Sequence, residues 1–192
     1  MAKPVRGTLG AVTERLITAE DALAHNSPYR HCEIWDGVAI LKDPCGGQSS
    51  AVSVNVIAPL AMHVRAGGLG WVFGSAQGFL VGRDPDRLLG PDAAFVARER
   101  LERIPERDFI ELAPDFLIEV RSPTDAWERT VHKCGIWVAH GARVVWALDP
   151  LTRTVAVLRG EEDVEVLRGE GSASAAPALP AFALTLDEIF FP

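Results

Sequence analysis

An acidic residue inside an apolar segment is the strongest chemical signal in this sequence. Glu119 lies within the segment Phe116–Val120, whose other four residues are apolar. Such a run predicts a buried strand. Because a carboxylate is costly to remove from water unless a cation pairs with it, we expect Glu119 to be held by a metal ion, an Arg or a Lys. The alternative is a strand that is buried on one face only, on which Glu119 points to water.

A second acid stands at the start of another apolar segment. Asp92 opens the segment Asp92–Ala97, which also predicts a strand. If the two strands pair, the carboxylates of Asp92 and Glu119 can converge, and two hard oxygen donors at one place favour Mg²⁺ or Mn²⁺. Such an ion polarises a phosphoryl oxygen and lowers the pKa of a bound water.

Lys133 is the candidate cation for this chemistry. It lies on the helix expected after the Glu119 strand, at the edge of an apolar helix face. That face consists of Trp127, Val131, Cys134 and Val138. A lysine at such an edge can bury its stem and direct its ammonium group inward, where it would stabilise the charge that builds on a phosphate.

Length and composition favour a single domain, residues 1–192, with a substantial core. The chain has 192 residues, of which 48% are hydrophobic, and a net charge of −7, which argues against a large surface that coats DNA non-specifically. Three cysteines without disulfide-like spacing indicate a reducing cytoplasm. The N-terminus lacks the apolar stretch of a signal peptide, and no apolar stretch is long enough to span a membrane.

The elements that must position these residues begin with a helix and a hairpin. Thr18–Asp21 has the pattern of a capping box, and the helix continues to Ala24. Asp36-Gly37 between the apolar segments Cys32–Trp35 and Val38–Leu41 predicts a β-hairpin. A second helix is expected over Ser49–Arg65, bent at Pro59.

Strands dominate the remainder of the chain. Thr124 is a plausible N-cap for a helix over Asp125–His140 that Gly141 ends. A C-terminal hairpin and several single strands are expected, over Trp71–Phe73, Gly78–Val81, Asp92–Ala97, Phe116–Val120, Val144–Leu148, Thr154–Leu158 and Val164–Leu167. We therefore predict a mixed α/β or α+β domain around one sheet, with residues 1–15 and 170–178 flexible.

Several motifs resemble one known family nearly end to end. They are Thr18–Asp21, Glu33–Gly37, Pro91–Val96, Ala113–Val120 with Ser122-Pro123, Lys133, Gly141–Trp146 with Asp149-Pro150, and Leu179–Phe182. In this combination the chain resembles the Uma-type restriction endonuclease family, a former domain-of-unknown-function family of the PD-(D/E)XK nuclease superfamily.

The resemblance implies a fold, a reaction and a set of site residues. The fold would be a restriction-endonuclease-like core, a mixed β-sheet flanked by α-helices. Asp92 and Glu119 would hold Mg²⁺ or Mn²⁺, and Lys133 would take the place of the superfamily lysine. Arg121, which stands in the usual lysine position, is a second candidate cation, and Glu33 resembles an early acidic residue of the family. The substrate would be DNA, cut by an enzyme that can act as a homodimer.

Some features depart from the family and leave alternatives open. Val38 follows Asp36-Gly37 where the family often has Glu, and Cys32 precedes Glu33 where it often has an aromatic residue. A catalytically inactive nuclease fold that binds nucleic acid or a protein is therefore the main alternative to a DNA endonuclease, and an unrelated hydrolase or structural domain is the third class. Asp115 is either a residue of a strand-entry turn or a further metal ligand.

Overall fold

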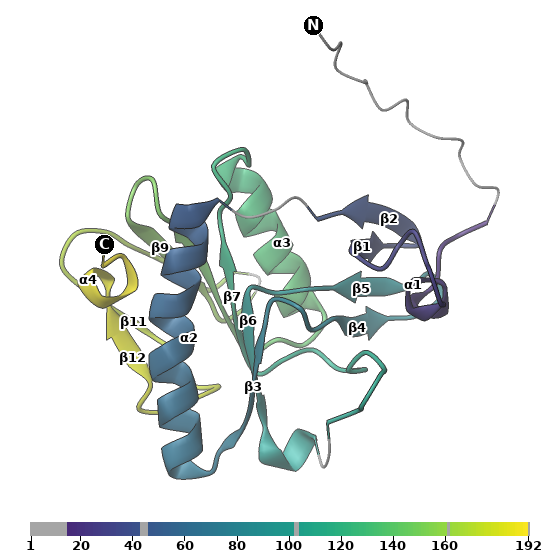
Figure 1. The fold of residues 1–192 in the computed structure, drawn as a ribbon. Coiled ribbons are helices and arrows are strands. Elements are labelled where there is room, and N and C mark those ends of the chain that lie inside the picture. The colour runs from purple at the N-terminus through teal and green to yellow at the C-terminus, as the bar shows by residue number, and fades with distance from the viewer. Residues whose placement is uncertain (1–14, 43–45, 102–103, 161, 192) are drawn as a thin grey trace, which may run out of the picture.

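The computed structural model describes residues 15–42, 46–101, 104–160 and 162–191, which form three β-sheets with helices packed around them (Figure 1). The central sheet has six strands in the order β10-β9-β8-β7-β6-β3, in which β7 and β8 run parallel and the other neighbours antiparallel. Its strands are β3 (Gly70–Gly74), β6 (Ala93–Ala97), β7 (Phe116–Val120), β8 (Val144–Asp149), β9 (Thr154–Leu158) and β10 (Val164–Leu167). The predicted mixed sheet and C-terminal hairpin are confirmed.

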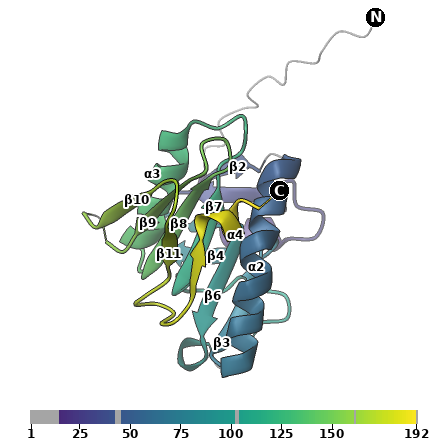
Figure 2. The same ribbon diagram turned by 90° about the vertical axis from the view of Figure 1, so that its left-hand side faces the viewer.

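Two long helices cover opposite faces of this sheet, as Figure 2 shows most clearly. Helix α2 (Gly47–Gly67) packs Val56 and Leu60 against Phe116 and Ile118, whereas helix α3 (Trp127–Ala139) packs Trp137 against the other face. Because side chains alternate along a strand, every second residue of β7 belongs to each layer. Both faces of the strand are buried, which explains its continuous apolar run.

The second sheet contains the predicted N-terminal hairpin. Its order is β2-β1-β5-β4, formed by β1 (Cys32–Trp35), β2 (Val38–Leu41), β4 (Phe79–Gly82) and β5 (Arg87–Leu89). The turn residues Asp36 and Gly37 both have positive φ, 51° and 77°, as a two-residue turn between twisted strands requires. Ile34 on β1 faces a small core of its own with Leu80 and Leu88.

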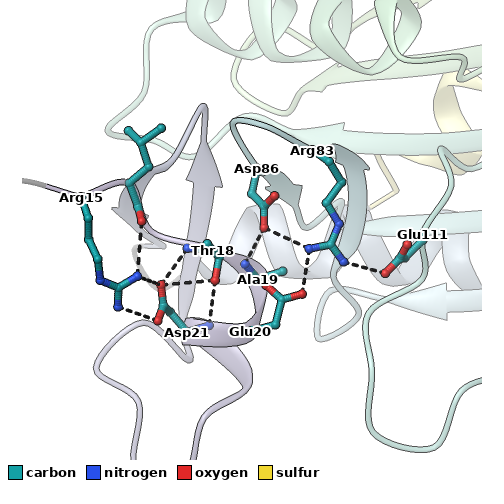
Figure 3. A network of polar contacts seen from close by, with 9 residues as sticks. Arg15, Thr18, Ala19, Glu20, Asp21, Arg83, Asp86 and Glu111 are labelled. Atoms are coloured by element: carbon teal, nitrogen blue, oxygen red, sulfur yellow. Dashed lines mark hydrogen bonds and ion pairs between the residues drawn. The ribbon is translucent and has the colours of Figure 1, made fainter.

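Helix α1 (Ala19–Leu23) is fixed to this sheet by a polar network (Figure 3). The Thr18–Asp21 capping box forms as predicted. Asp86 accepts a 2.7 Å hydrogen bond from the Ala19 amide, and Arg83 donates to Glu20 over 2.7 Å. The α1 segment is therefore held against the β4–β5 connection. It shares a hydrophobic core with Ile34 of β1, the strand that carries Glu33.

Helix α2 follows the predicted pattern, with its buried residues Val52, Val56, Leu60 and Val64 on one face and Pro59 inside it. The C-terminal helix α4 (Leu186–Ile189) packs beside it, where the Asn55 amide donates to the Ile189 carbonyl over 3.1 Å. No helix in the described ranges is both long and apolar enough to cross a membrane.

Two expectations about the fold are wrong. The strands form three sheets, because the N-terminal hairpin pairs with β5, a three-residue strand too short to predict, and not with the central sheet. Within residues 170–178, for which we expected flexibility, β11 (Ser172–Ser174) pairs with β12 (Ala183–Thr185). The small side chains of β11 allow close approach to Trp146, whose indole donates to the Ser174 carbonyl over 3.3 Å.

The second correction concerns the start of α3. Thr124 does not cap it, because a turn closed by the Asp125 amide and the Ser122 carbonyl places the helix start at Trp127, after Ala126. The expectation of a flexible N-terminus concerns residues 1–15, of which residues 1–14 lie outside the described part of the chain.

The β3–β6 contact gives a prediction for stability. A Cβ atom at Gly70 would lie 2.1 Å from the Val96 carbonyl oxygen, a distance that forces the two backbones apart. We expect Gly70→Ala to lower the free energy of unfolding by about 2–4 kcal/mol. Gly74→Ala, at the other end of β3 with open space for its Cβ, is the matched control and should change stability by less than about 0.5 kcal/mol in urea unfolding. Equal effects of the two substitutions would contradict this account.

Candidate active site

Asp92 and Glu119 lie on the same face of the central sheet. In the antiparallel β6–β7 pair, Ala93 is opposite Ile118 and Ala94 is opposite Leu117. One further step of this register brings Asp92 beside Glu119, and both side chains then point to the α3 face by alternation. The Asp92 amide donates to the Ile118 carbonyl over 3.1 Å, so the pairing extends to this end of the strands. The two strands therefore bring these carboxylates to the same place, as the sequence predicted.

Glu119 is buried, with 6% of its surface exposed, and the hydrogen bonds that its carboxylate accepts from the described residues come from α3. The Trp137 indole donates to Glu119 Oε1 over 2.7 Å. Lys133 Nζ lies 2.8 and 2.9 Å from the two Glu119 oxygens. The alternative in which Glu119 faces water is thus wrong, since a cation and an indole satisfy the buried carboxylate.

Lys133 reaches this point from the edge of the helix, with 15% of its side chain exposed. Its ammonium group also donates to Glu33 Oε1 over 2.7 Å and to the Gly90 carbonyl over 3.2 Å. An ammonium group has three protons, and Glu33, Glu119 and Gly90 supply three acceptors. The group is therefore fixed between two acids that come from different sheets.

Glu33 enters the site from β1, and the rest of the carboxylate is also occupied. The Trp35 indole donates to its Oε2 over 2.9 Å, and the Gly90 amide donates to its Oε1 over 3.1 Å. Lys42 lies 4.0 Å from the same Oε1 and donates to the Gly90 carbonyl over 2.9 Å. Glu33, an acid that the family resemblance singled out, is thus in direct contact with Lys133.

Asp92 has a different environment from the two glutamates. Its Oδ2 accepts a 2.7 Å hydrogen bond from the Val120 amide, and no other described residue donates to its side chain. The carboxylate is half-buried and borders an open cavity of about 150 Å³. Residues from the four-stranded sheet, the six-stranded sheet and α3 line this cavity, among them Glu33, Lys42, Asp92, Glu119, Arg129 and Lys133. An oxygen of Asp92 is thus available to a ligand in the cavity.

The close packing of these charges moves their pKa values in different directions. Burial, assisted by the charges of Asp92 and Glu33, raises the pKa of Glu119 to about 7 in spite of Lys133. Burial opposes the charge of Lys133, but Glu119 and Glu33 outweigh it, so the pKa of Lys133 is raised. Burial would also raise the pKa of Glu33, but the charges of Lys133 and Lys42 prevail and lower it. Proton exchange near neutral pH therefore concerns Glu119.

Arg121 and Asp115 lie apart from this cluster. The Arg121 guanidinium donates to Asp149 Oδ2 over 2.9 Å and to the Asp125 carbonyl over 2.9 Å. Asp115 is fully buried at the opposite end of β7 from Glu119, where it accepts from the Ala97 amide and pairs with Arg100. These contacts tie loops and strand ends together, which favours a structural role for Asp115.

Sequence reasoning missed the residues that orient the acids. Trp137 lies one helical turn after Lys133, and Trp35 lies two residues after Glu33 on the same strand face. Both spacings are visible in the sequence, but a tryptophan in an apolar segment indicates a core residue as readily as a hydrogen-bond donor. Lys42 and Gly90 gave no comparable signal, because their positions depend on the contact between the two sheets.

The donor set suits a small divalent cation. Among the described residues no group of three or more His, Cys, Asp or Glu side chains is arranged to hold a metal ion. The chain thus offers the two carboxylates of Asp92 and Glu119 at one cavity. Because Mg²⁺ is typically bound by one or two carboxylates, with water and substrate phosphate as the other ligands, the residues present fit such an ion.

The raised pKa of Glu119 predicts a pH-dependent stability. A carboxyl group whose pKa rises from 4.5 to about 7 on folding binds its proton more tightly in the folded state. Its contribution is therefore complete below pH 4.5 and is lost as the pH rises through 7, a change of about 3 kcal/mol. Without divalent metal, the stability of the wild type relative to Glu119→Gln should fall over this range in urea unfolding. Glu106→Gln, at an exposed position, should leave the pH profile unchanged; a constant difference between wild type and Glu119→Gln would contradict the shift.

Comparisons with known proteins identify the fold and the family of this chain. No curated protein matches the chain. A solved structure of a "putative nuclease belonging to DUF820" from Anabaena variabilis ATCC 29413 is similar in fold, with a TM-score of 0.73, 21% sequence identity, and coverage of 83% of this chain and 89% of that chain. The model of the Uma2 family, described as "Putative restriction endonuclease", matches residues 19–187. The chain therefore belongs to the Uma2 family.

Proposed function

We propose that the protein is a metal-dependent endonuclease that hydrolyses DNA phosphodiester bonds with Asp92, Glu119 and Lys133. The observation that carries the proposal is the position of Lys133, whose ammonium group contacts Glu119 at the cavity that Asp92 also lines. Two carboxylates and a lysine on one face of a mixed sheet are suited to phosphoryl chemistry. Membership of a family described as restriction endonucleases supports the same reaction.

Asp92 and Glu119 would hold Mg²⁺ or Mn²⁺. When bound, such an ion supplies polarisation of the phosphoryl group and a more acidic water. Asp92 is ready for this role because one of its oxygens accepts no hydrogen bond from the described residues. Glu119 is kept in place by Trp137, so the carboxylate keeps its orientation when Lys133 turns to another partner.

Lys133 would stabilise the negative charge that builds on the scissile phosphate. Its ammonium group already lies at the cavity, where it would exchange its bond to Glu119 for one to the phosphate while Glu33 and Gly90 keep it in place. Glu33 acts as a positioning residue in this scheme. Its bond to Lys133 aims the lysine, and the Trp35 indole in turn orients Glu33.

A DNA cleavage assay tests the proposal. Wild-type protein with Mg²⁺ or Mn²⁺ is expected to cut supercoiled or single-stranded DNA, and Glu119→Gln should lower the rate by at least about a hundredfold, because it removes a metal-binding charge. Glu106→Gln, an exposed substitution of the same kind, should cut like the wild type. Calorimetric titration with Mn²⁺ should show binding to the wild type and weaker binding to Glu119→Gln.

Two results would overturn the proposal in different ways. Equal cutting by the wild type and Glu119→Gln would remove Glu119 from the mechanism. Absence of cutting by the wild type with either metal would favour the catalytically inactive nuclease fold that the sequence also allows.

The two candidate cations can be separated by substitution. Lys133→Gln should lower the cleavage rate by about 10²–10³-fold, because it removes the cation beside the phosphate. Arg121→Gln should change the rate by less than about tenfold, because Arg121 is engaged by Asp149 and Asp125. Both variants are compared at a temperature where circular dichroism shows them folded. A larger loss for Arg121→Gln would assign the catalytic charge to Arg121.

A further inference from the structure

A second cavity adjoins the candidate active site. It has a volume of about 470 Å³ and shares Glu33 and Lys42 with the first cavity, while Gly90, the acceptor of Lys133, also lines it. The two cavities therefore meet where Lys42 and Lys133 both donate to the Gly90 carbonyl. A volume of this size lies within the range of small-ligand pockets, about 300–1,000 Å³.

The wall formed by the N-terminal hairpin carries positive charge. The Lys42 amide donates to the His31 carbonyl over 3.2 Å, which extends the β1–β2 pairing by one step and places both side chains on the face of Glu33. Arg30 lies next in the chain and is exposed, with no ion pair to any described residue. Glu33, the acid of this wall, is neutralised by Lys133. The wall thus favours a phosphate group.

The opposite wall offers an aromatic ring and an amide. Phe109 is half-buried and lies directly against Gly78, where an added Cβ would be 2.7 Å from the ring. The ring is held there because the Ile110 amide donates to the Gly78 carbonyl and the Leu80 amide donates to the Ile110 carbonyl. Gln77 lines the same cavity, and its amide nitrogen donates to the Gly78 carbonyl, which leaves its side-chain oxygen as an acceptor.

We propose that this second cavity binds one unpaired nucleotide next to the scissile phosphate. Arg30 and Lys42 contact its phosphate, Phe109 contacts the face of its base, and Gln77 accepts a hydrogen bond from its edge. The proposal rests on the proposed function, because the first cavity supplies the scissile position. It adds a substrate class: single-stranded DNA, or DNA with an unpaired nucleotide at the cut.

The dimensions and charges favour an unpaired nucleotide over an intact duplex. Stacking on Phe109 requires a base whose face is free, and a base within a duplex is covered by its neighbours. A volume of about 470 Å³ is that of a small-ligand pocket and not of a groove along a duplex. The chain has a net charge of −7, so long-range attraction to DNA is weak. Contacts at a few positions must then supply most of the affinity.

Fluorescence anisotropy with a labelled oligothymidylate of about ten nucleotides tests this site. In EDTA, where the proposed metal-dependent cleavage does not occur, the wild type should bind this probe more tightly than a duplex of equal length. Arg30→Gln should weaken binding and reduce the slope of log K against log salt by about 0.7, the value for one lost phosphate contact. Phe109→Leu should weaken binding by about fivefold to a hundredfold without changing that slope, and Phe109→Tyr should restore it.

Arg65→Gln, on the far end of α2, is the matched control and should bind like the wild type. Arg30 is exposed, so its substitution tests the site without affecting the core. The proposal is overturned if the duplex binds as tightly as the single strand, if neither binds, or if Arg30→Gln and Phe109→Leu both behave like Arg65→Gln.

The binding assay and the cleavage assay fail independently. If the protein cuts DNA but its affinity does not depend on Arg30 and Phe109, the proposed nuclease activity stands and the proposed nucleotide site is wrong. If binding depends on both residues but the protein never cuts DNA, the proposed nucleotide site stands and the proposed nuclease activity is wrong.

Discussion

The site depends on one partly buried ammonium group that two carboxylates share. Lys133 contacts Glu33 and Glu119, and the three residues come from α3, β1 and β7. Removing one member of a buried ion group leaves an unpaired charge and costs about 3–5 kcal/mol, so these elements must fold together. Asp92 and Lys42 line the same cavity, so acids and cations face one another there.

The same group joins the two larger sheets. The chain leaves the four-stranded sheet at Leu89 and enters the six-stranded sheet at Ala93, so Gly90 lies at the crossing. Its amide donates to Glu33 and its carbonyl accepts from Lys133 and Lys42. The backbone of Gly90 is therefore part of the polar cluster. A change in the distance between the two sheets would change the positions of the acids as well. This explains how an acid on a short N-terminal hairpin can act together with acids of the central sheet.

The sequence predicts best where a local pattern decides the structure. Strand β7 was predicted with its observed bounds, and β8 lacked only its last residue, because both are apolar runs buried on two faces; the acid within β7 identified the site. The direction of Arg121 was not predictable, because Asp149, which holds it, is distant in the chain. The same holds for the pairing of the N-terminal hairpin with β5. Strand β11 was not predictable, because its small residues suit both a flexible linker and a strand packed against Trp146.

Burial alone does not distinguish the acids of the site from the other buried acids. Asp86 and Asp149 each accept from a backbone amide and pair with an arginine, so their oxygens are used to close local structure. The Glu119 carboxylate accepts from no backbone amide among the described residues; its partners are two side chains of α3, one of which is a cation. Asp92 keeps an oxygen without a donor at the same cavity. Acids whose partners are side chains, or whose oxygens are not all paired, can exchange these contacts for a ligand, and for this reason we propose a reactive role for Glu119 and Asp92 and a structural one for Asp86 and Asp149.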